Sequence, residues 1–276
     1  MPKDQKTQVF VCKEHKIRLP QFLEKKTKKG FSQKKWKRIL ENNCVRVNGQ
    51  IERFASTDLF SGDVVEILLQ EEWEKPSLLY EDDYLVIWNK PRGIVSQEVC
   101  AQYTLVHRLD KETSGALLFG KTSEVAVLLE ELFRLRTIKK EYIAVVDGIV
   151  TTDQGTITSR IQKKQERIFV SSSQGAYAKT AYKVLKRSKQ ATLVALFPIT
   201  GKTHQLRLHM QDLGHPILGD YHYARKRGCN SFPATRLLLH ALKLSFFHPV
   251  TKKRLTTKAP LPKSFLRDLE KIFPKS

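Results

Sequence analysis

Hydrophobic positions in the first seventy residues predict two short helices followed by strands. Ser32 can cap the second helix. Short strands on either side of the turn pair Asn48-Gly49 are typical of a tight hairpin, and a last strand is expected over residues 64–69. The apolar residues with helical spacing are Leu19, Phe22 and Leu23 in the first helix and Trp36, Ile39 and Leu40 in the second.

Beyond residue 77 the pattern changes to longer strands with few helices. Thr122 or Ser123 can cap one helix, and a second short helix follows residue 203 and ends at Gly214. Because strands outnumber helices without regular alternation, we expect an α+β domain with a largely antiparallel or mixed sheet. The buried stripe of the first of these helices is predicted to be Val125, Leu128, Leu129 and Leu132. The predicted strands cover residues 85–88, 115–119, 142–146, 179–185, 192–197 and 242–247.

The acidic, proline-bearing segment 71–77 is the clearest seam in the chain. We therefore predict four parts: an N-terminal extension over 1–15, a small domain over 16–70, a linker over 71–77 and a large domain over 78–276. A length of 276 residues suits one full domain with a smaller one attached. We find no basis for more than one copy and expect a monomer.

The chain carries a formal net charge of +21, and 41% of its residues are hydrophobic. An apolar fraction of this size supports a packed core, and so large a positive charge favours a polyanionic partner such as nucleic acid. A basic membrane-surface protein would show the same total, but it usually carries an amphipathic anchoring helix, which we do not find. The net charge by itself therefore only partly favours nucleic acid over a membrane surface as the partner.

Lysines and arginines crowd the predicted helix-loop-helix at the start of the chain. A solvated surface would give the same run, but acidic neighbours are almost absent here, which favours contacts to backbone phosphates. We predict Lys34, Lys35 and Arg38 as RNA-binding residues. The order of elements resembles the small S-four-type RNA-binding domain, named after a protein of the small ribosomal subunit. Pro20 departs from that pattern, in which Asp is common, and should alter only the helix start.

Cysteine spacing and hydropathy exclude several other classes. The four cysteines, Cys12, Cys44, Cys100 and Cys229, form no C-x-x-C pair, so we expect neither a metal site nor a disulfide framework. No apolar run is long enough for a membrane span, and the N-terminal segment does not resemble a signal peptide. We therefore expect a cytoplasmic protein without a membrane partner.

Three groups of residues are candidates for chemistry. Residues 107–115 place acidic, basic and hydroxyl side chains before an apolar strand, and residues 200–209 place another polar cluster at a helix start. Tyr142 lies in a predicted strand. Taken alone, the first is most simply a solvated turn, the second the polar face of an amphipathic helix, and the third a core aromatic.

Together, however, these segments resemble the RluA family of RNA pseudouridine synthases. His107-Arg108-Leu109-Asp110-(x2)-Thr113-Ser114-Gly115 is similar to the family's signature loop. The other similar motifs, in family order, are Glu81-Asp82-(x)-Tyr84-Leu85 to Asn89-Lys90-Pro91-(x)-Gly93, Lys140-(x)-Tyr142-(x)-Ala144, Gly201-Lys202-Thr203-His204-Gln205-(x)-Arg207-(x)-His209, and two stretches beginning at His215 and Leu239. They cover almost all of residues 78–260. Two departures are a short connection from Ile94 to Val106 and Lys202 in place of the commoner Arg.

The resemblance implies isomerisation of uridine to pseudouridine in RNA, without cofactor or metal. It implies that Asp110 is the carboxylate that attacks the sugar or assists elimination from it, and that Arg207 is its partner. It assigns Tyr142 to stacking on the uracil, with acceptance of the proton lost from the new glycosidic carbon as a second role. Arg108 would fill the space of the flipped nucleotide or hold its phosphate, and Lys202 and His204 are assigned to RNA contact.

Two readings compete with this one. The first is a non-catalytic RNA-binding or ribosome-assembly factor built on a synthase that has lost activity, which the presence of Asp110, Tyr142 and Arg207 opposes. The second is the related small-subunit-type synthase group, whose loop usually begins with Gly where this chain has His107. Large-subunit ribosomal RNA is the favoured substrate, and transfer RNA is the alternative.

Overall fold

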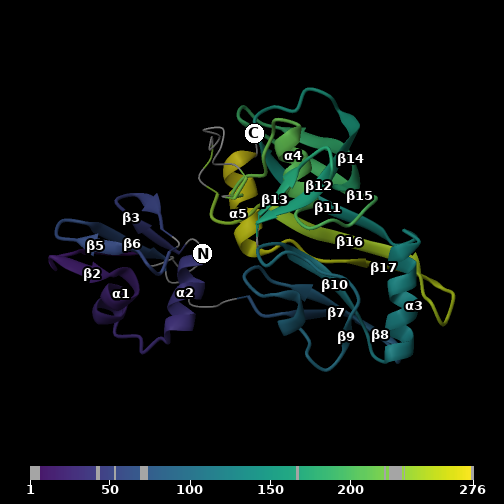
Figure 1. The fold of residues 1–276 in the computed structure, drawn as a ribbon, viewed down its shortest axis with the longest axis horizontal. Coiled ribbons are helices and arrows are strands. Elements are labelled where there is room, and N and C mark those ends of the chain that lie inside the picture. Colours follow the sequence, from purple (N-terminus) through teal and green to yellow (C-terminus); the bar gives the residue numbers. More distant parts are fainter. Residues whose placement is uncertain are drawn as a thin grey trace. The chain divides into compact units, whose positions relative to one another are not determined.

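The computed structural model describes residues 7–41, 44–52, 54–68, 74–165, 168–220, 222–223, 232 and 234–274. The chain divides into two units, Met1–Glu74 and Lys75–Ser276 (Figure 1). The division falls within the acidic segment 71–77. No helix in the described ranges is long and apolar enough to cross a membrane.

The smaller unit contains the two predicted helices and the predicted hairpin. Its four-stranded antiparallel sheet has the order β1-β6-β3-β4, and β2 pairs separately with β5. Asn48 and Gly49 both have positive φ, as the tight hairpin turn requires. The elements are β1 (Thr7–Val11), β2 (Lys16–Arg18), α1 (Leu19–Thr27), α2 (Gln33–Glu41), β3 (Val45–Val47), β4 (Gln50–Ile51), β5 (Asp58–Phe60) and β6 (Val64–Leu68). Strand β1 lies in the segment that the sequence analysis set aside as an extension.

The six apolar residues predicted to face the core of this unit are all buried. Glu24 ties the two helices together, because its carboxylate accepts hydrogen bonds from the Trp36 indole at 2.8 Å and from the backbone N–H groups of Gly30 and Phe31. Lysines on the same helix-loop-helix are exposed. They are Lys25, Lys28, Lys29, Lys35 and Lys37. The side chains of Lys34 and Arg38 lie outside the described part of the structure.

The larger unit is built on an eleven-stranded mixed sheet, and the α+β prediction is confirmed. The strand order is β13-β12-β14-β15-β11-β16-β10-β8-β7, with β17 paired to β16 and β9 to β10. The pairing of β10 with β16 is parallel and the other pairings are antiparallel. The strands are β7 (Ser77–Glu81), β8 (Leu85–Lys90), β9 (Thr104–Leu105), β10 (Ser114–Gly120), β11 (Lys139–Asp147), β12 (Gln154–Gln165), β13 (Ile168–Ser171), β14 (Ala176–Arg187), β15 (Ala191–Pro198), β16 (Leu239–Phe247) and β17 (Arg254–Lys258).

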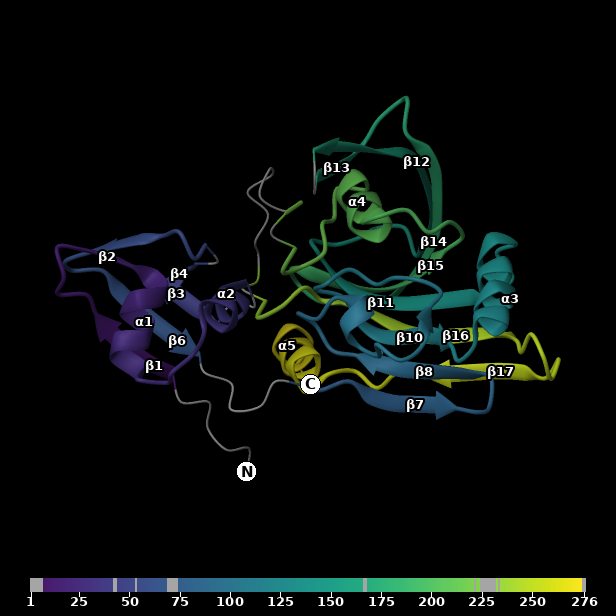
Figure 2. The same ribbon diagram turned by 60° about the horizontal axis from the view of Figure 1, so that its bottom comes forward.

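Helices α4 (Gln205–Asp212) and α5 (Lys263–Ile272) pack on opposite faces of this sheet (Figure 2). Strand β11 shows this directly, because alternate side chains of a strand point to opposite faces. Ala144 and Val146 share a core cluster with Leu206 and Met210 of α4. The side chains of Ile143 and Val145 pack in the cluster of α5 instead. By the same alternation, Tyr142 lies on the α4 side of the sheet.

Helix α3 (Ser123–Arg134) begins as predicted, with the Thr122 hydroxyl accepting a hydrogen bond from the Val125 N–H. The prediction that Leu128 belongs to its buried face is wrong, because 45% of this side chain is exposed. Val125, Ala126 and Leu129 are buried instead. At about 100° per residue, Leu128 lies well to one side of that stripe.

Strand β12 and helix α5 were not predicted. In β12 only Ile157 and Ile161 are buried apolar residues, and its other positions are mostly polar, so the strand lacks clear hydrophobic alternation. Its backbone is instead held by β13 and β14 on either side. Helix α5 does carry Phe265, Leu269 and Ile272 at helical spacing, so a signal for it was present in the chain.

Candidate active site

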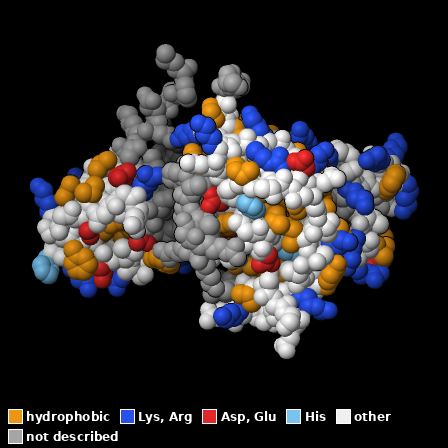
Figure 3. All heavy atoms as spheres, turned by 90° about the horizontal axis from the view of Figure 1, so that it is seen from above, with side chains coloured by type: hydrophobic (Ala, Val, Ile, Leu, Met, Phe, Trp, Pro, Cys, Tyr) orange, Lys and Arg blue, Asp and Glu red, His pale blue; other side chains and the backbone are white. Residues whose placement is uncertain are grey.

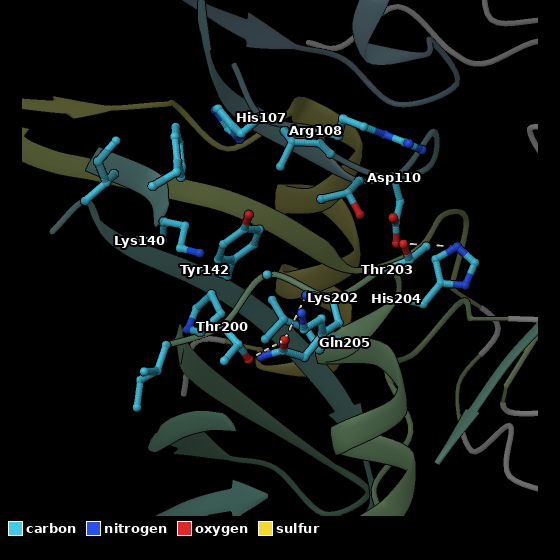
Figure 4. Close-up of a pocket in the computed structure, with 18 of the residues that line it drawn as sticks. His107, Arg108, Asp110, Lys140, Tyr142, Thr200, Lys202, Thr203, His204 and Gln205 are labelled. Atoms are coloured by element: carbon cyan, nitrogen blue, oxygen red, sulfur yellow. Dashed lines mark hydrogen bonds and ion pairs between the residues drawn. The ribbon is translucent and has the colours of Figure 1, made fainter. Parts of the chain in front are cut away.

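A cavity of about 1040 Å³ opens on the α4 side of the larger unit. Three segments that are distant in sequence form its walls: the loop 105–113, the stretch 133–142 and the stretch 197–207. Asp110, Tyr142 and Arg207 all line it, so the structure brings the three predicted central residues together. In Figure 4, Asp110 lies between Tyr142 on one side and His204 on the other.

Asp110 is held in a turn whose backbone is tied down on both sides. Its carbonyl accepts a hydrogen bond from the Thr113 N–H at 3.0 Å. The Ser96 hydroxyl both accepts from the Leu109 N–H and donates to the Leu109 carbonyl, each at 3.0 Å. The side chain of Asp110 remains 25% exposed and reaches the cavity. The loop is therefore rigid while its carboxylate stays accessible.

A buried lysine fastens this loop to the preceding motif. Lys90 is fully buried, and its ammonium donates to the carbonyls of Pro91, Ile94 and Lys111 at 2.8–3.1 Å. Burial lowers the pKa of Lys90 to about 7, although Glu112 and then Asp110 act in the opposite direction. The sequence showed Lys90 only as part of a motif, and its role as a clamp depends on contacts with a loop about twenty residues later.

The far end of the loop is fixed by a second buried group. Arg236 donates to the Ser114 hydroxyl at 2.6 Å. That hydroxyl donates in turn to Nδ1 of His240 at 2.8 Å, because Nε2 of the ring faces the Ala259 carbonyl at 3.3 Å and carries the hydrogen. Burial lowers the pKa of His240 to about 3, which agrees with a neutral ring that accepts at Nδ1. Gly115 has a φ of +121°, and a side chain there would overlap the carbonyl of Ala241. Only glycine allows the close parallel pairing of β10 with β16 at this point.

Arg207 is shared between two carboxylates. It is buried and makes a two-bonded ion pair with Asp220, with Nε to Oδ2 at 2.7 Å and Nη2 to Oδ1 at 2.8 Å. Its remaining nitrogen, Nη1, lies 3.4 Å from Oδ2 of Asp110. Burial opposes the charge of Arg207, but Asp220 outweighs it, and the pKa of the guanidinium is raised. The interpretation of the 204–211 stretch as an ordinary polar helix face therefore fails at Arg207.

The ring of His204 lies beside the same carboxylate. His204 precedes α4 with a positive φ of 57°, and its side chain lines the cavity. Its Nε2 lies 3.9 Å from Oδ2 of Asp110, and its Nδ1 lies 2.6 Å from the Tyr223 hydroxyl. The rings of Phe169 and Tyr223 contact it edge-on. Burial is the main cause that lowers the pKa of His204.

Helix α4 is anchored to the sheet by a polar network beneath it. The Gln205 amide donates to the Lys179 carbonyl and the Thr180 hydroxyl, and its oxygen accepts from the Thr200 hydroxyl and the Lys202 N–H. One turn later, Nδ1 of His209 lies 2.8 Å from the same Thr180 hydroxyl. These bonds fix the helix from which Arg207 projects. The sequence analysis named neither Gln205 nor His209 as a site residue, although both lie within the recognised motif.

Tyr142 lies at a β-bulge of β11, where the pairing with β16 shifts between Glu141 and Tyr142. Its ring lines the cavity and packs against buried apolar residues. Burial, and then the negative charge of Asp110, raise the pKa of its phenol. Tyr142 is therefore a neutral phenol at physiological pH.

The remaining predicted residues are divided between the two units. Arg108 and Lys202 are exposed at the edge of the cavity. The ring of His107 stacks on Phe133 at 4.7 Å and accepts a hydrogen bond from the Leu118 N–H, so it supports the loop. Lys35 belongs to the smaller unit. Sequence reasoning did not name Asp220 or Tyr223 as site residues, although both lie in a recognised motif.

Known proteins are similar to this chain over most of the segments that line the cavity. The family model described as RNA pseudouridylate synthase matches residues 84–212. The dual-specificity RNA pseudouridine synthase RluA of Vibrio cholerae is 37% identical over an alignment of 194 residues, and the match covers 62% of this chain and 77% of that protein. The chain belongs to the RluA family of RNA pseudouridine synthases.

This synthase also resembles longer relatives and solved structures. The ribosomal large subunit pseudouridine synthase C of Vibrio cholerae is 32% identical over 274 residues, covering 85% of this chain and 87% of that protein. The structure of human RNA pseudouridylate synthase domain containing 4 superimposes with a TM-score of 0.59 at 28% identity. That match covers 71% of this chain and 92% of the human one. The pseudouridine synthase fold of the larger unit is thus shared with solved members of the family.

Proposed function

We propose that this synthase isomerises uridine to pseudouridine in large-subunit ribosomal RNA, with Asp110 as the carboxylate that acts on the ribose. The observation that carries the proposal is the position of Asp110 in an open cavity, 3.4 Å from a buried guanidinium. The guanidinium of Arg207 places a positive charge directly beside that carboxylate. An ionised carboxylate can trap or stabilise a cationic sugar centre, as carboxylates do in glycosidases.

The neutral phenol of Tyr142 supports stacking as its role. An uncharged hydroxyl is a very weak base, so the raised pKa argues against Tyr142 as the group that accepts the proton from the new glycosidic carbon. An aromatic ring that lines the cavity can instead hold the uracil by its face, which contributes about 1–3 kcal/mol per base. Of the two roles that the resemblance implies for Tyr142, we therefore propose stacking on the uracil.

Cationic side chains around the cavity supply contacts for the RNA backbone. A uridine within a helix must leave its stack to reach Asp110, which costs a few kcal/mol. Arg108 is exposed beside the carboxylate and can occupy the vacated position or bind the phosphate. Basic side chains are widely spread and acidic ones sparse over the face of the larger unit seen in Figure 3. The other cations that line the cavity are Arg134, Arg136, Lys139, Lys140 and Lys202.

The share of this chain that each relative matches favours ribosomal RNA as the substrate. The relatives named for the ribosomal large subunit match 85% or more of this chain in several cases, whereas the dual-specificity relative matches 62%. Because the larger unit is less than three quarters of the chain, the longer matches extend into the smaller unit. The exposed lysines of α1, α2 and their connection give that unit the charge to bind RNA phosphates, as the S-four-type resemblance implies.

The test is to map pseudouridines in cells that contain the protein, lack it, or contain only Asp110→Asn. Loss of one or more large-subunit sites in the last two strains is the expected result. Loss confined to transfer RNA would identify the alternative substrate. The non-catalytic reading predicts that the purified protein releases no tritium from RNA labelled at C5 of uridine, and such a result would refute the enzymatic proposal.

A further inference from the structure

Asp110 has two nitrogen neighbours, and both lie against the same oxygen. Arg207 Nη1 is 3.4 Å from Oδ2, and His204 Nε2 is 3.9 Å from that same Oδ2. Among the described residues, Oδ1 has no such partner. If Asp110 acts on the ribose, as proposed above, Oδ1 is the oxygen left free to meet the sugar.

The ring of His204 is held so that this contact can tighten. The rings of Phe169 and Tyr223 confine it at centroid distances of 5.4 and 5.6 Å. Only 18% of the His204 side chain is exposed. A distance of 3.9 Å is too long for a hydrogen bond, but such contacts are commonly long in a free enzyme and shorten when the substrate binds.

Tyr223 decides which nitrogen of the ring carries the hydrogen. A neutral imidazole has one N–H donor and one acceptor. Burial lowers the pKa of His204, with Arg207 and His222 acting in the same direction and Asp110 and Asp220 opposing them, so the ring is neutral near pH 7. If the Tyr223 hydroxyl, 2.6 Å away, donates to Nδ1, then Nε2 must bear the hydrogen, and it points toward Asp110.

We propose that His204 is a positioning residue that, oriented by Tyr223, donates from Nε2 to Oδ2 of Asp110 and leaves Oδ1 as the reacting oxygen. This proposal depends on the proposed function of Asp110. It replaces the earlier assignment of His204 to RNA contact. Tyr223 contacts both nitrogen-bearing neighbours of Asp110. Its hydroxyl lies beside Nδ1 of His204, and its ring lies 4.9 Å from the Arg207 guanidinium.

Two substitutions at position 204 separate the donor from the bulk of the ring. In His204→Gln the amide nitrogen can reach the place of Nε2 and keep a donor there, whereas His204→Leu fills the space without one. We expect kcat of His204→Leu to fall about 10- to 100-fold, the effect of losing a hydrogen bond to a charged group, with KM for RNA nearly unchanged. Most of this loss should be restored in His204→Gln.

Tyr223→Phe tests the orienting hydroxyl alone. It keeps the aromatic ring beside Arg207 and His204 but removes the donor to Nδ1, so kcat should fall by less than in His204→Leu. His215→Gln is the matched control, because His215 also lies near α4 but its Nδ1 contacts the Asp147 carbonyl, away from the cavity. Circular dichroism and thermal unfolding of each variant establish that it is folded.

Different results would contradict the role of His204 and the proposed function of the protein. A rise in KM with unchanged kcat in His204→Leu would return His204 to RNA binding and overturn the proposal. Equal losses in His204→Leu and His204→Gln would also overturn it, because the donor would then be irrelevant. If wild-type protein itself forms no pseudouridine, the proposed function fails, and that result is distinct from normal turnover by His204→Leu.

Discussion

Arg207 and Asp220 form a buried ion pair in which both carboxylate oxygens are bonded, at 2.7 and 2.8 Å, while the guanidinium also faces Asp110. Their side chains are 5% and 1% exposed. Asp220 lies in the loop after α4 and fixes the plane of the guanidinium. The one nitrogen it leaves over, Nη1, is the one that reaches the cavity.

Replacing Asp220 should therefore affect both stability and turnover. Asp220→Asn leaves the buried charge of Arg207 without its main partner, and we expect the free energy of unfolding to fall by about 3 kcal/mol. Denaturant unfolding of the single variant and of Asp220→Asn/Arg207→Met measures this. The double variant should recover part of the loss, because both buried charges are gone. Equal stability of wild type and Asp220→Asn would contradict the conclusion that Asp220 compensates the buried charge of Arg207.

Asp110→Asn should eliminate pseudouridine formation and leave RNA affinity nearly intact. The substitution preserves the shape of the side chain but removes the charge that we propose acts on the sugar. Tritium release under single-turnover conditions measures the reaction, and a filter-binding titration measures affinity. Normal turnover by this variant would show that the carboxylate is not required.

Tyr142 offers a direct test of stacking against proton acceptance. Tyr142→Phe keeps the ring and removes the hydroxyl, so kcat should stay close to that of wild type. Tyr142→Leu removes the ring, and kcat/KM should fall about 10- to 100-fold, the equivalent of removing one base stack. If the phenol accepted the proton, Tyr142→Phe would be the inactive variant instead.

Stability should decrease as the pH falls from about 6.5 to about 3. Burial lowers the pKa of His240 to about 3, and burial and then Lys140 do the same for His107. Between about pH 3 and 6.5 the unfolded chain binds these protons and the folded chain does not, so acid favours unfolding. In His240→Gln the free energy of unfolding should vary less steeply with pH across this window. An unchanged slope would show that His240 titrates alike in both states.

The exposed lysines of the smaller unit should set the salt dependence of RNA binding. Exchanging Lys28, Lys29 and Lys35 for Gln should weaken affinity and reduce the slope of log affinity against log salt by about one for each phosphate that is no longer neutralised. A variant with Lys252, Lys253 and Lys258 exchanged for Gln, in the turn between β16 and β17 and at the end of β17, removes the same three charges and controls for net charge. Equal weakening in both variants would mean that these lysines act only through the net charge of the protein and make no local contacts to phosphates.

Much of this candidate site could be predicted from the sequence, because motif residues keep their spacing along the chain. Asp110, Tyr142 and Arg207 were all named from sequence, and the cavity contains all three. What could not be predicted are the groups that act through space. Lys90 bonds a loop about twenty residues away, and Arg236 reaches Ser114 across more than a hundred residues. The hydrophobic pattern of the sequence gives no signal of such contacts.

The amino-acid sequence by itself determined the helices and strands with a clear hydrophobic period, the α+β class and the family, and it supplied the candidate residues Asp110, Tyr142 and Arg207. Those depend on local pattern and on motif spacing, which a single chain displays. Only the tertiary structure decided that Leu128 is exposed, that polar strand β12 joins the sheet, and that two nitrogens meet one oxygen of Asp110. The reason is physical: burial and electrostatic pairing depend on which distant segments pack together, and packing is a property of the whole folded chain.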